Sequence, residues 1–301
     1  MRARLIGVDW GTTRLRACLI GDGGRVIDAR ETDEGLRALG PGLFEPALAR
    51  AAAEWRAAHG ALPILCSGMV GARSGWIEAP YVACPADAAT LAQGLVSLDT
   101  QTLGRVHVLP GVRQADDVMR GEETQIFGAL AMDCGDGLYV LPGTHSKWAR
   151  VERQRIARFS TMMTGDVFAA LKDHTILAAS MGEAASDAGF ARGLAMAREL
   201  DGAGDLLTKL FGLRVAALDG VLSPEDSAGA LSGLLIGAEF AAMARGADRI
   251  VLIAGDALAA RYEEAAACFG VSATRAPPHC AAQGQFVLAY AAGLVENRDH
   301  D

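Results

Sequence analysis

The first thirty residues place glycine turns between strands, and this order excludes the commonest nucleotide-binding folds. Residues 4–9, 15–20 and 25–30 each have the composition of a strand, and GDGG at 21–24 is typical of a hairpin turn. A Walker or Rossmann site needs its glycine loop to open a helix, whereas WGTT at 10–13 leads into another strand. The region also lacks GxxxxGK and GxGxxG. We therefore expect an α/β protein that begins with a meander of strands.

The second half of the chain repeats this pattern faintly. Three strands are predicted between residues 138 and 160, and helices dominate the remainder of the chain. The turns DWGTT and PGTHS hold similar places in the two halves. Since 301 residues suffice for about two domains, we predict two related α/β lobes that face each other across a cleft. Their expected bounds are 1–135 and 136–295, followed by a frayed tail at 296–301.

Three segments between and after these meanders have clear local patterns. Residues 44–59 predict an amphipathic helix, because Leu48 and Trp55 fall on one face. Residues 67–87 are rich in Gly and Pro and predict a loop, with a helix near 88–98 after it. An Ala-rich helix near 281–295 is expected to end the second lobe.

Composition limits the class of partner. The 28 Lys and Arg against 36 Asp and Glu leave a formal charge of −8, which argues against binding to nucleic acid or an anionic membrane. A small anionic ligand stays compatible, because a few local donors suffice for it. No apolar run reaches the roughly 18 residues of a membrane span, and the six cysteines form no CxxC pair. We expect a cytoplasmic protein without nucleic-acid or membrane partners, and a homodimer stays open.

The turn after the first strand, WGTT (the first Gly-Thr turn), carries the residues of an anion site. Asp9 ends a buried strand, where a carboxylate is costly unless it is paired or near a metal. Gly11 allows close approach of an anion, and Thr12 and Thr13 supply hydroxyl donors. This set suits a polyphosphate with Mg²⁺ bound by Asp9 directly or through water. The alternative is a plain hairpin with a capping Asp.

The turn at residues 142–145, PGTH (the second Gly-Thr turn), is a second candidate phosphate site. Gly143 and Thr144 would contact the phosphate, and Lys147 would either neutralise developing charge or lie on a solvated strand face. His145 is more typical of a hydrogen-bonded structural residue. Further along, Gly255 follows a buried strand and opens a helix, which would let a flat base lie against the backbone.

Acidic residues at two predicted helix starts are candidates for a general base. Glu122 and Glu123 begin one helix, and because neighbouring helical positions differ by about 100°, both cannot face the same atom. Asp116 and Asp117, just upstream, are rivals. Asp166 begins another helix, where an N-terminal cap is the default role and a catalytic acid the alternative.

The Gly-rich loop at residues 66–76 is a candidate substrate site, since such loops on α/β scaffolds often contact ligands. Arg73 in this loop and Arg120 before Glu122 are the candidate ligands for a substrate carboxylate. A flexible surface loop is the alternative. The full set of candidate substrate residues is Ser67, Gly68, Met69, Arg73, Trp76, Arg120 and Asp166.

Together these segments resemble the 2-keto-3-deoxygalactonate kinases, a family of the actin, heat-shock-protein and sugar-kinase superfamily. The resemblance rests on IGVDWGTTRLRA, SGMVGARSGWIEAPYV, VMRGEETQIFGAL, LPGTHSKWARV, TMMTGDVFAAL and LSGLLIGAE, which occur in order along the chain. It implies a two-domain actin-like ATPase (ribonuclease H-like) fold with a nucleotide cleft between the lobes. It also implies ATP-dependent phosphorylation of the 6-hydroxyl of 2-keto-3-deoxygalactonate in galactonate catabolism, with Mg²⁺.

The resemblance also implies roles for individual residues. GEETQ resembles the Gly-Asp-Gln-Gln helix start of larger sugar kinases, which maps the base onto Glu122, with Glu in place of Asp. Asp9 would organise Mg²⁺, while both Gly-Thr turns would contact phosphates. The alternatives are a kinase for another keto-deoxy sugar acid or a hexose, a nucleotide-binding regulator without turnover, and a phosphohydrolase.

Overall fold

The computed structural model describes residues 2–40 and 42–296, which form two compact units. Unit 1 comprises the described residues up to Asp136, residues 149–159, and the described residues from Ala276 on, and unit 2 comprises 137–148 and 160–275. The expected boundary at 135/136 lies beside the first of these divisions. The expected second lobe 136–295 differs, because the C-terminal helix packs in unit 1. The expected tail lies outside the described residues apart from Glu296.

The sheet of unit 1 begins with the predicted meander. Its strands lie in the order β3-β2-β1-β4-β7-β6. The first three are antiparallel, β4 is parallel to both β1 and β7, and β6 is antiparallel to β7. The strands are β1 (Ala3–Trp10), β2 (Leu15–Gly21), β3 (Val26–Thr32), β4 (Ile64–Ser67), β6 (Val96–Asp99) and β7 (Arg105–Val108).

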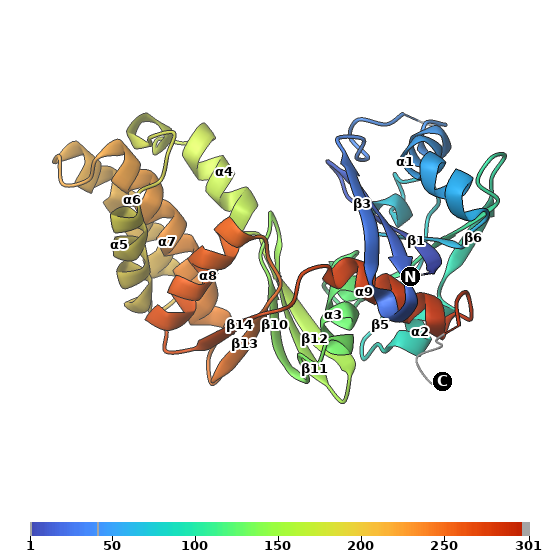
Figure 1. The fold of residues 1–301 in the computed structure, drawn as a ribbon. Helices are drawn as coiled ribbons and strands as arrows, with labels where there is room; N and C mark the ends of the chain where they lie inside the picture. Colours follow the sequence, from blue (N-terminus) through green and yellow to red (C-terminus); the bar gives the residue numbers. More distant parts are fainter. Residues whose placement is uncertain (1, 41, 297–301) are drawn as a thin grey trace. The chain divides into compact units, whose positions relative to one another are not determined.

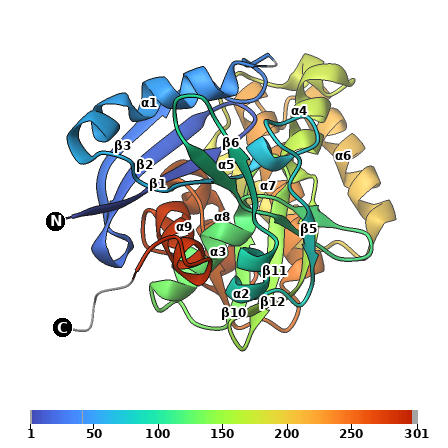
Figure 2. The ribbon, with the colours of Figure 1, turned by 90° about the vertical axis from the view of Figure 1, so that its right-hand side faces the viewer.

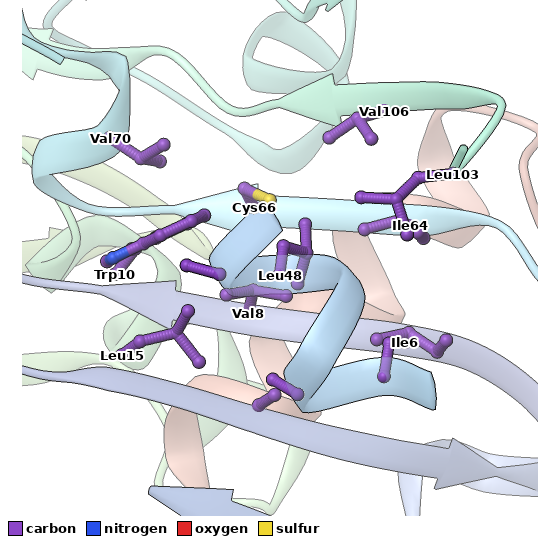
Figure 3. Packing of buried hydrophobic residues seen from close by; sticks show 14 of the residues in the cluster. Ile6, Val8, Trp10, Leu15, Leu48, Ile64, Cys66, Val70, Leu103 and Val106 are labelled. Atoms are coloured by element: carbon purple, nitrogen blue, oxygen red, sulfur yellow. The ribbon is translucent and has the colours of Figure 1, made fainter. Parts of the chain in front are cut away.

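Helices cover both faces of this sheet (Figure 2). Ile6 and Val8 of β1 pack in one cluster with Leu48 of α1 (Phe44–His59), whose bounds are those predicted (Figure 3). Gly7 faces the other way, since a Cβ there would lie 2.1 Å from Oε1 of Gln285 in α9 (Cys280–Ala291). Because strand residues alternate between faces, Asp9 lies on the α9 side, away from the main cluster.

Helix α9 crosses α3 (Glu122–Ala131) at a close contact of glycines. A Cβ at Gly128 would lie 1.8 Å from the carbonyl oxygen of Cys280, and one at Gly284 would lie 1.8 Å from that of Thr124. Only glycine permits the two backbones to approach so closely. This contact explains why the C-terminal helix returns to unit 1, and it fixes the helix that begins at Glu122.

The segment between β4 and α3 is more structured than predicted. The expected loop 67–87 contains η2 (Met69–Gly71) and β5 (Tyr81–Ala83), which pairs in a small sheet with β8 (Gly111–Arg113) and β9 (Val118–Met119). The helix expected over 88–98 ends early, as α2 (Ala88–Gln93), because Gly94 caps it. Alternating Val96 and Leu98 then form β6.

Unit 2 combines a sheet with helices that pack on it. The strands, all labelled in Figure 1, lie in the order β12-β11-β10-β13-β14. Residues 149–159, which include parts of β11 and β12, belong to unit 1. These strands are β10 (Gly137–Leu141), β11 (Ser146–Glu152), β12 (Arg155–Met162), β13 (Arg249–Leu252) and β14 (Ser272–Arg275). The helices are α4 (Thr164–His174), α5 (Asp187–Arg198), α6 (Ala203–Leu218), α7 (Pro224–Met243) and α8 (Asp256–Cys268). No helix of the described residues has both the length and the apolar character to cross a membrane.

Candidate functional site

In unit 1, Asp9 lies at the carboxyl end of β1, beside the end of β4. The parallel register pairs Asp9 with Ser67, and in open α/β sheets ligands bind outside the carboxyl ends of parallel strands. Ser67 itself is buried. Its hydroxyl donates to the Val8 carbonyl (3.4 Å) and accepts from Nε2 of Gln285 (2.9 Å). The structure therefore gives Ser67 internal partners and leaves Asp9 at the strand end.

The Asp9 carboxylate is largely enclosed, and its side chain is 19% exposed. Burial raises its pKa, and the nearby Arg16 (3.7 Å from Nη1) opposes that shift. Arg16 is shared with Glu31, which lies 2.8 Å from its Nε. Arg16 therefore offsets only part of the cost of burying the Asp9 carboxylate, and this position suits the binding of a further cation.

The donor set near Asp9 fits Mg²⁺ that is bound together with phosphate. No group of three or more His, Cys, Asp or Glu among the described residues is arranged to hold a metal by itself. Mg²⁺ in kinases is commonly held by one or two carboxylates plus substrate phosphates and waters. The single enclosed carboxylate of Asp9 therefore fits a metal that is bound together with a phosphate ligand.

The first Gly-Thr turn is held by backbone hydrogen bonds. The amide of Gly11 donates to the Arg14 carbonyl (2.9 Å), and the amide of Arg37 donates to the Thr12 carbonyl (2.9 Å). The hydroxyls of Thr12 and Thr13 form no hydrogen bond with another described residue. The backbone thus fixes the turn while leaving both hydroxyls available to a ligand.

The start of α3 meets the ends of β1 and β4. Gly121 has φ 110° and precedes Glu122, and a Cβ there would lie 3.3 Å from Cα of Gly68. A Cβ at Gly68 would in turn lie 2.9 Å from the Trp10 carbonyl oxygen and 3.3 Å from Oδ1 of Asp9. Two glycines therefore bring the helix start that carries Glu122 close to Asp9.

The two acids at this helix start have different environments. Both carboxylate oxygens of the buried Glu123 accept from the Gly121 amide (2.9 and 2.8 Å), and the Thr124 hydroxyl donates to one of them. Burial, followed by the charge of Glu122, raises the pKa of Glu123 to about 8. Glu122 is half-buried and accepts from the Arg120 amide (3.0 Å). Glu123 thus acts as an internal cap, and Glu122 is the more exposed of the two acids.

The two candidate arginines also differ. Arg120 is 9% exposed, donates from Nη2 to the Ala79 carbonyl (2.8 Å), and lies 4.2 Å from the centre of the Tyr81 ring. Its Nε and Nη1 are enclosed without a partner among the described residues. Arg73 is exposed and forms no ion pair with the described residues. Arg73 is therefore the accessible cation, while Arg120 anchors the loop at residues 79–81.

Two other loop residues of the predicted substrate set have structural contacts. Trp76 stacks on Phe44 (ring centres 6.1 Å apart, planes at 9°) and meets Trp10 edge-on (6.2 Å). Met69 is half-buried at the start of η2. Packing accounts for the position of Trp76, so its contact with substrate stays a prediction.

In unit 2, the second Gly-Thr turn rests on the first turn of α4. The Thr144 carbonyl accepts from the amides of Gly165 (3.1 Å) and Asp166 (3.2 Å). A Cβ at Gly165 would lie 2.7 Å from Cα of Thr144, so glycine is needed there. Asp166 is hydrogen-bonded to Nε2 of His145 (2.6 Å), which gives both residues a role in fixing this turn. Gly143 faces open space, and a ligand can approach its backbone.

Lys147 is not on a solvated strand face. It is 6% exposed, and its Nζ donates to the Thr161 hydroxyl on β12 (2.7 Å). The sequence of β11 alone does not predict the burial of Lys147. A strand with one solvated face would alternate buried and exposed residues, whereas Ser146, Lys147 and Trp148 are all buried.

A cavity of about 200 Å³ opens beside the second Gly-Thr turn. Its mostly apolar lining suits the flat, largely apolar ring of a nucleobase. Gly255, at the start of α8, is exposed, and no atom lies within 4 Å of a Cβ built on it. Sequence reasoning missed most of this cavity because its walls come from three helices far apart in the chain. It is lined by Gly143, Thr164, Gly165, Phe168, Ser232, Leu235, Ile236, Leu258 and Tyr262.

Comparison with known proteins gives consistent matches over nearly the whole chain. Residues 9–288 match the family model described as 2-keto-3-deoxy-galactonokinase. The chain is 36% identical over 283 residues to the 2-dehydro-3-deoxygalactonokinase of Escherichia coli (strain K12), covering 91% of this chain and 93% of that protein. A crystal structure of a Sinorhizobium meliloti protein provisionally named a 2-dehydro-3-deoxygalactonokinase is 33% identical, with a TM-score of 0.86, and covers 95% of this chain and 98% of that one.

A more distant structure shares the fold alone. Component A of the (R)-2-hydroxyglutaryl-CoA dehydratase from Acidaminococcus fermentans is 13% identical, with a TM-score of 0.53, over 97% of this chain and 100% of that one. With the strand order of the two sheets, these similarities confirm the predicted α/β, actin-like ATPase fold class. The cleft expected with that fold stays a prediction.

Proposed function

Because the chain belongs to the 2-keto-3-deoxy-galactonokinase family, we propose that it transfers a phosphoryl group from ATP to the 6-hydroxyl of 2-keto-3-deoxygalactonate. The family expected from the sequence motifs is thereby confirmed, and membership in a sugar-kinase family implies the use of ATP. The observation that carries the proposal in the structure itself is the convergence of Asp9 with the helix start at Glu122, at the ends of two parallel strands.

We assign the chemistry of proton removal to Glu122. Phosphoryl transfer needs positioning and charge stabilisation more than covalent help, so one acid that accepts the hydroxyl proton suffices. Glu122 is accessible, whereas Glu123 is buried and occupied by the Gly121 amide. Asp166, one of the rival acids, is paired with His145.

The first Gly-Thr turn and Asp9 are assigned to the phosphates and their metal. Asp9 would hold Mg²⁺, which when bound neutralises part of the phosphate charge. The hydroxyls of Thr12 and Thr13 would donate to phosphate oxygens, since the structure leaves both hydroxyls available, and Gly11 would let a phosphate approach the backbone closely.

Unit 2 is assigned to the nucleotide. The cavity beside α4, α7 and α8 would take the nucleoside, with the base near Gly255. Gly143 and Thr144 would contact phosphate through the backbone that faces open space. Lys147 is buried next to this turn, and its charge would favour an anion there.

The sugar acid is assigned to the loop after β4. Arg73 is an exposed cation without an internal partner among the described residues, which suits recognition of the substrate carboxylate. Gly68 and Met69 would line the same site, since Gly68 lies beside Asp9. Arg120 stabilises this loop by donating a hydrogen bond to the Ala79 carbonyl.

Two finer expectations rest on the sequence. A cytoplasmic location fits the six cysteines, which are all free thiols. A homodimer stays a prediction that a sizing measurement would test.

The assignment of the base is tested by matched amide variants. Glu122→Gln keeps size and hydrogen-bonding capacity, so we expect ATP affinity close to wild type and turnover lower by roughly 10²-fold or more. Asp166→Asn and Asp117→Asn serve as controls and should retain more turnover than Glu122→Gln. Near-normal turnover in Glu122→Gln together with an inactive Asp166 or Asp117 variant would overturn the assignment. A panel of keto-deoxy acids and neutral hexoses, assayed by ADP release, separates the proposed substrate from the alternatives.

A further inference from the structure

The segment LSGLLIGAE, in α7, ends in a buried acid to which no role has been assigned. Glu239 is 1% exposed, on the side of α7 that packs near the sheet. No Lys or Arg among the described residues forms an ion pair with it, and neutral hydrogen-bond donors surround it. A buried carboxylate without a cation is costly, so an apolar residue would serve packing better. The presence of an acid at this buried position therefore calls for another explanation.

Four donors from three elements meet at this carboxylate, and one of them is the hydroxyl of Ser146 in β11. Nε1 of Trp148 in β11 donates to one oxygen (2.5 Å), and the Tyr262 hydroxyl in α8 donates to the other (2.9 Å). The hydroxyl of Thr164, the first residue of α4, donates to that second oxygen as well. An ionised carboxylate has only acceptor sites, so it can accept a hydrogen bond from each of these side chains. Burial raises the pKa of Glu239, and these hydrogen bonds oppose the shift.

The same three elements hold the second Gly-Thr turn from both ends. The Tyr262 hydroxyl is hydrogen-bonded to the hydroxyl of Ser146 (2.8 Å), the residue that directly follows the turn. Thr164 precedes Gly165 and Asp166, whose amides donate to the carbonyl of Thr144 within the turn. A displacement of the Glu239 carboxylate would therefore release both supports of the turn.

Two of the donors also form a wall of the cavity beside that turn. Thr164 and Tyr262 both line it, and Glu239 lies behind them. The carboxylate thus orients the side chains that a nucleoside would contact, without itself facing the cavity.

We propose that Glu239 is a positioning residue that fixes the second Gly-Thr turn and the adjoining cavity wall for nucleotide binding. This inference rests on the proposed function of the turn and cavity. It concerns geometry and leaves proton transfer to Glu122. Glu239 acts through Thr164, Tyr262 and Ser146, so its loss should weaken ATP binding selectively.

Two variants test this inference in the full chain. Glu239→Gln places an amide donor opposite at least one existing donor, and we expect the KM for ATP to rise about tenfold or more. Tyr262→Phe removes only the hydroxyl that is hydrogen-bonded to both Glu239 and Ser146, and we expect a rise in the KM for ATP of about threefold to tenfold. The KM for the sugar acid should stay within about twofold in both, because the residues assigned to that substrate belong to unit 1. Direct ATP binding, measured by calorimetry, should fall in parallel.

A stability-matched control separates positioning from packing. Leu231 lies on the same helix, in an apolar cluster with residues of α5 and α6. Leu231→Ala should lower the unfolding temperature while leaving the KM for ATP unchanged. The inference is overturned if Glu239→Gln behaves like Leu231→Ala, with lower stability and an unchanged KM for ATP. An unchanged KM in a stable Glu239→Gln overturns it as well.

Two further outcomes are assigned in advance. If Glu239→Gln fails to fold, the ATP affinity of Tyr262→Phe decides between the two roles of Glu239. Wild-type ATP affinity in Tyr262→Phe then overturns the inference. If the wild-type protein yields no sugar phosphate, the proposed reaction fails, but the calorimetric comparison of ATP binding still decides the role of Glu239. The two failures are therefore distinguishable.

Discussion

The crossing of α3 and α9 gives the sharpest stability prediction. Gly284→Ala would place a Cβ 1.8 Å from the carbonyl oxygen of Thr124, whereas close C···O contacts are about 3.3 Å. The obstacle is backbone on both sides, so the helices must separate by more than about 1 Å. Overpacking of a tight core typically costs about 1–3 kcal/mol.

The higher helix propensity of alanine offsets part of this loss of stability. Alanine is favoured over glycine in a helix interior by about 1 kcal/mol. Because the clash involves two backbones and no flexible side chain, we place the cost at the upper end of that range or above it. The expected net effect of Gly284→Ala is a loss of about 2 kcal/mol or more in the free energy of unfolding.

A matched substitution isolates the clash from helix propensity. Gly212 lies within α6, and no atom comes within 4 Å of a Cβ built on it. Gly212→Ala should therefore stabilise the protein by up to about 1 kcal/mol. The two variants change the same atoms and have opposite predicted signs.

Urea unfolding followed by tryptophan fluorescence is the assay. Three of the four tryptophans (Trp10, Trp55 and Trp76) lie in unit 1, so the signal reports mainly on the unit that contains the crossing. Equal or higher stability of Gly284→Ala relative to wild type would refute the reasoning. Activity should fall together with stability in this variant, because α3 begins at Glu122.

Three further predictions concern charge. Burial raises the pKa of Glu123 from an ordinary 4.5 to about 8, so the folded state holds a proton that the unfolded state has lost. The free energy of unfolding should therefore fall as pH rises from 4.5 to about 8, and Glu123→Gln should remove this part of the pH dependence. Identical pH profiles of the wild type and the variant in urea unfolding would contradict this prediction. Arg73→Ala should raise the KM for the sugar acid about tenfold or more and leave the KM for ATP unchanged; coupled kinetics check this, and an unchanged sugar-acid KM excludes the assignment. Asp9→Asn should lower turnover by about 10²-fold or more without loss of thermal stability, because burial already disfavours the charge; a large drop in melting temperature would show that Asp9 is structural.

Local patterns predicted the elements that depend on local interactions. The opening meander and α1 follow from alternation and from the helical spacing of Leu48 and Trp55. The Gly-Thr turns could be identified from the sequence because glycine permits a tight bend and threonine supplies a hydroxyl donor. The start of α3 at Glu122 was predicted as well, since acids favour a helix N-terminus.

Features that depend on distant contacts were not predictable in this way. The strands β5, β8 and β9 are two or three residues long, and their pairing joins segments that lie apart in the chain. The return of α9 to unit 1 depends on Gly128 and Gly284, which are far apart in the chain. The burial of Lys147 and the donors around Glu239 likewise come from separate elements, so no single segment carries the signal.

Analysis of the reaction products tests the central claim most directly. Purified protein is incubated with ATP, Mg²⁺ and 2-keto-3-deoxygalactonate, and the products are identified by phosphorus NMR and mass spectrometry. We predict one 6-phosphate ester for each ADP formed, and little ADP without the sugar acid. Release of inorganic phosphate at the same rate with and without the sugar acid, and no phosphate ester, would contradict the account.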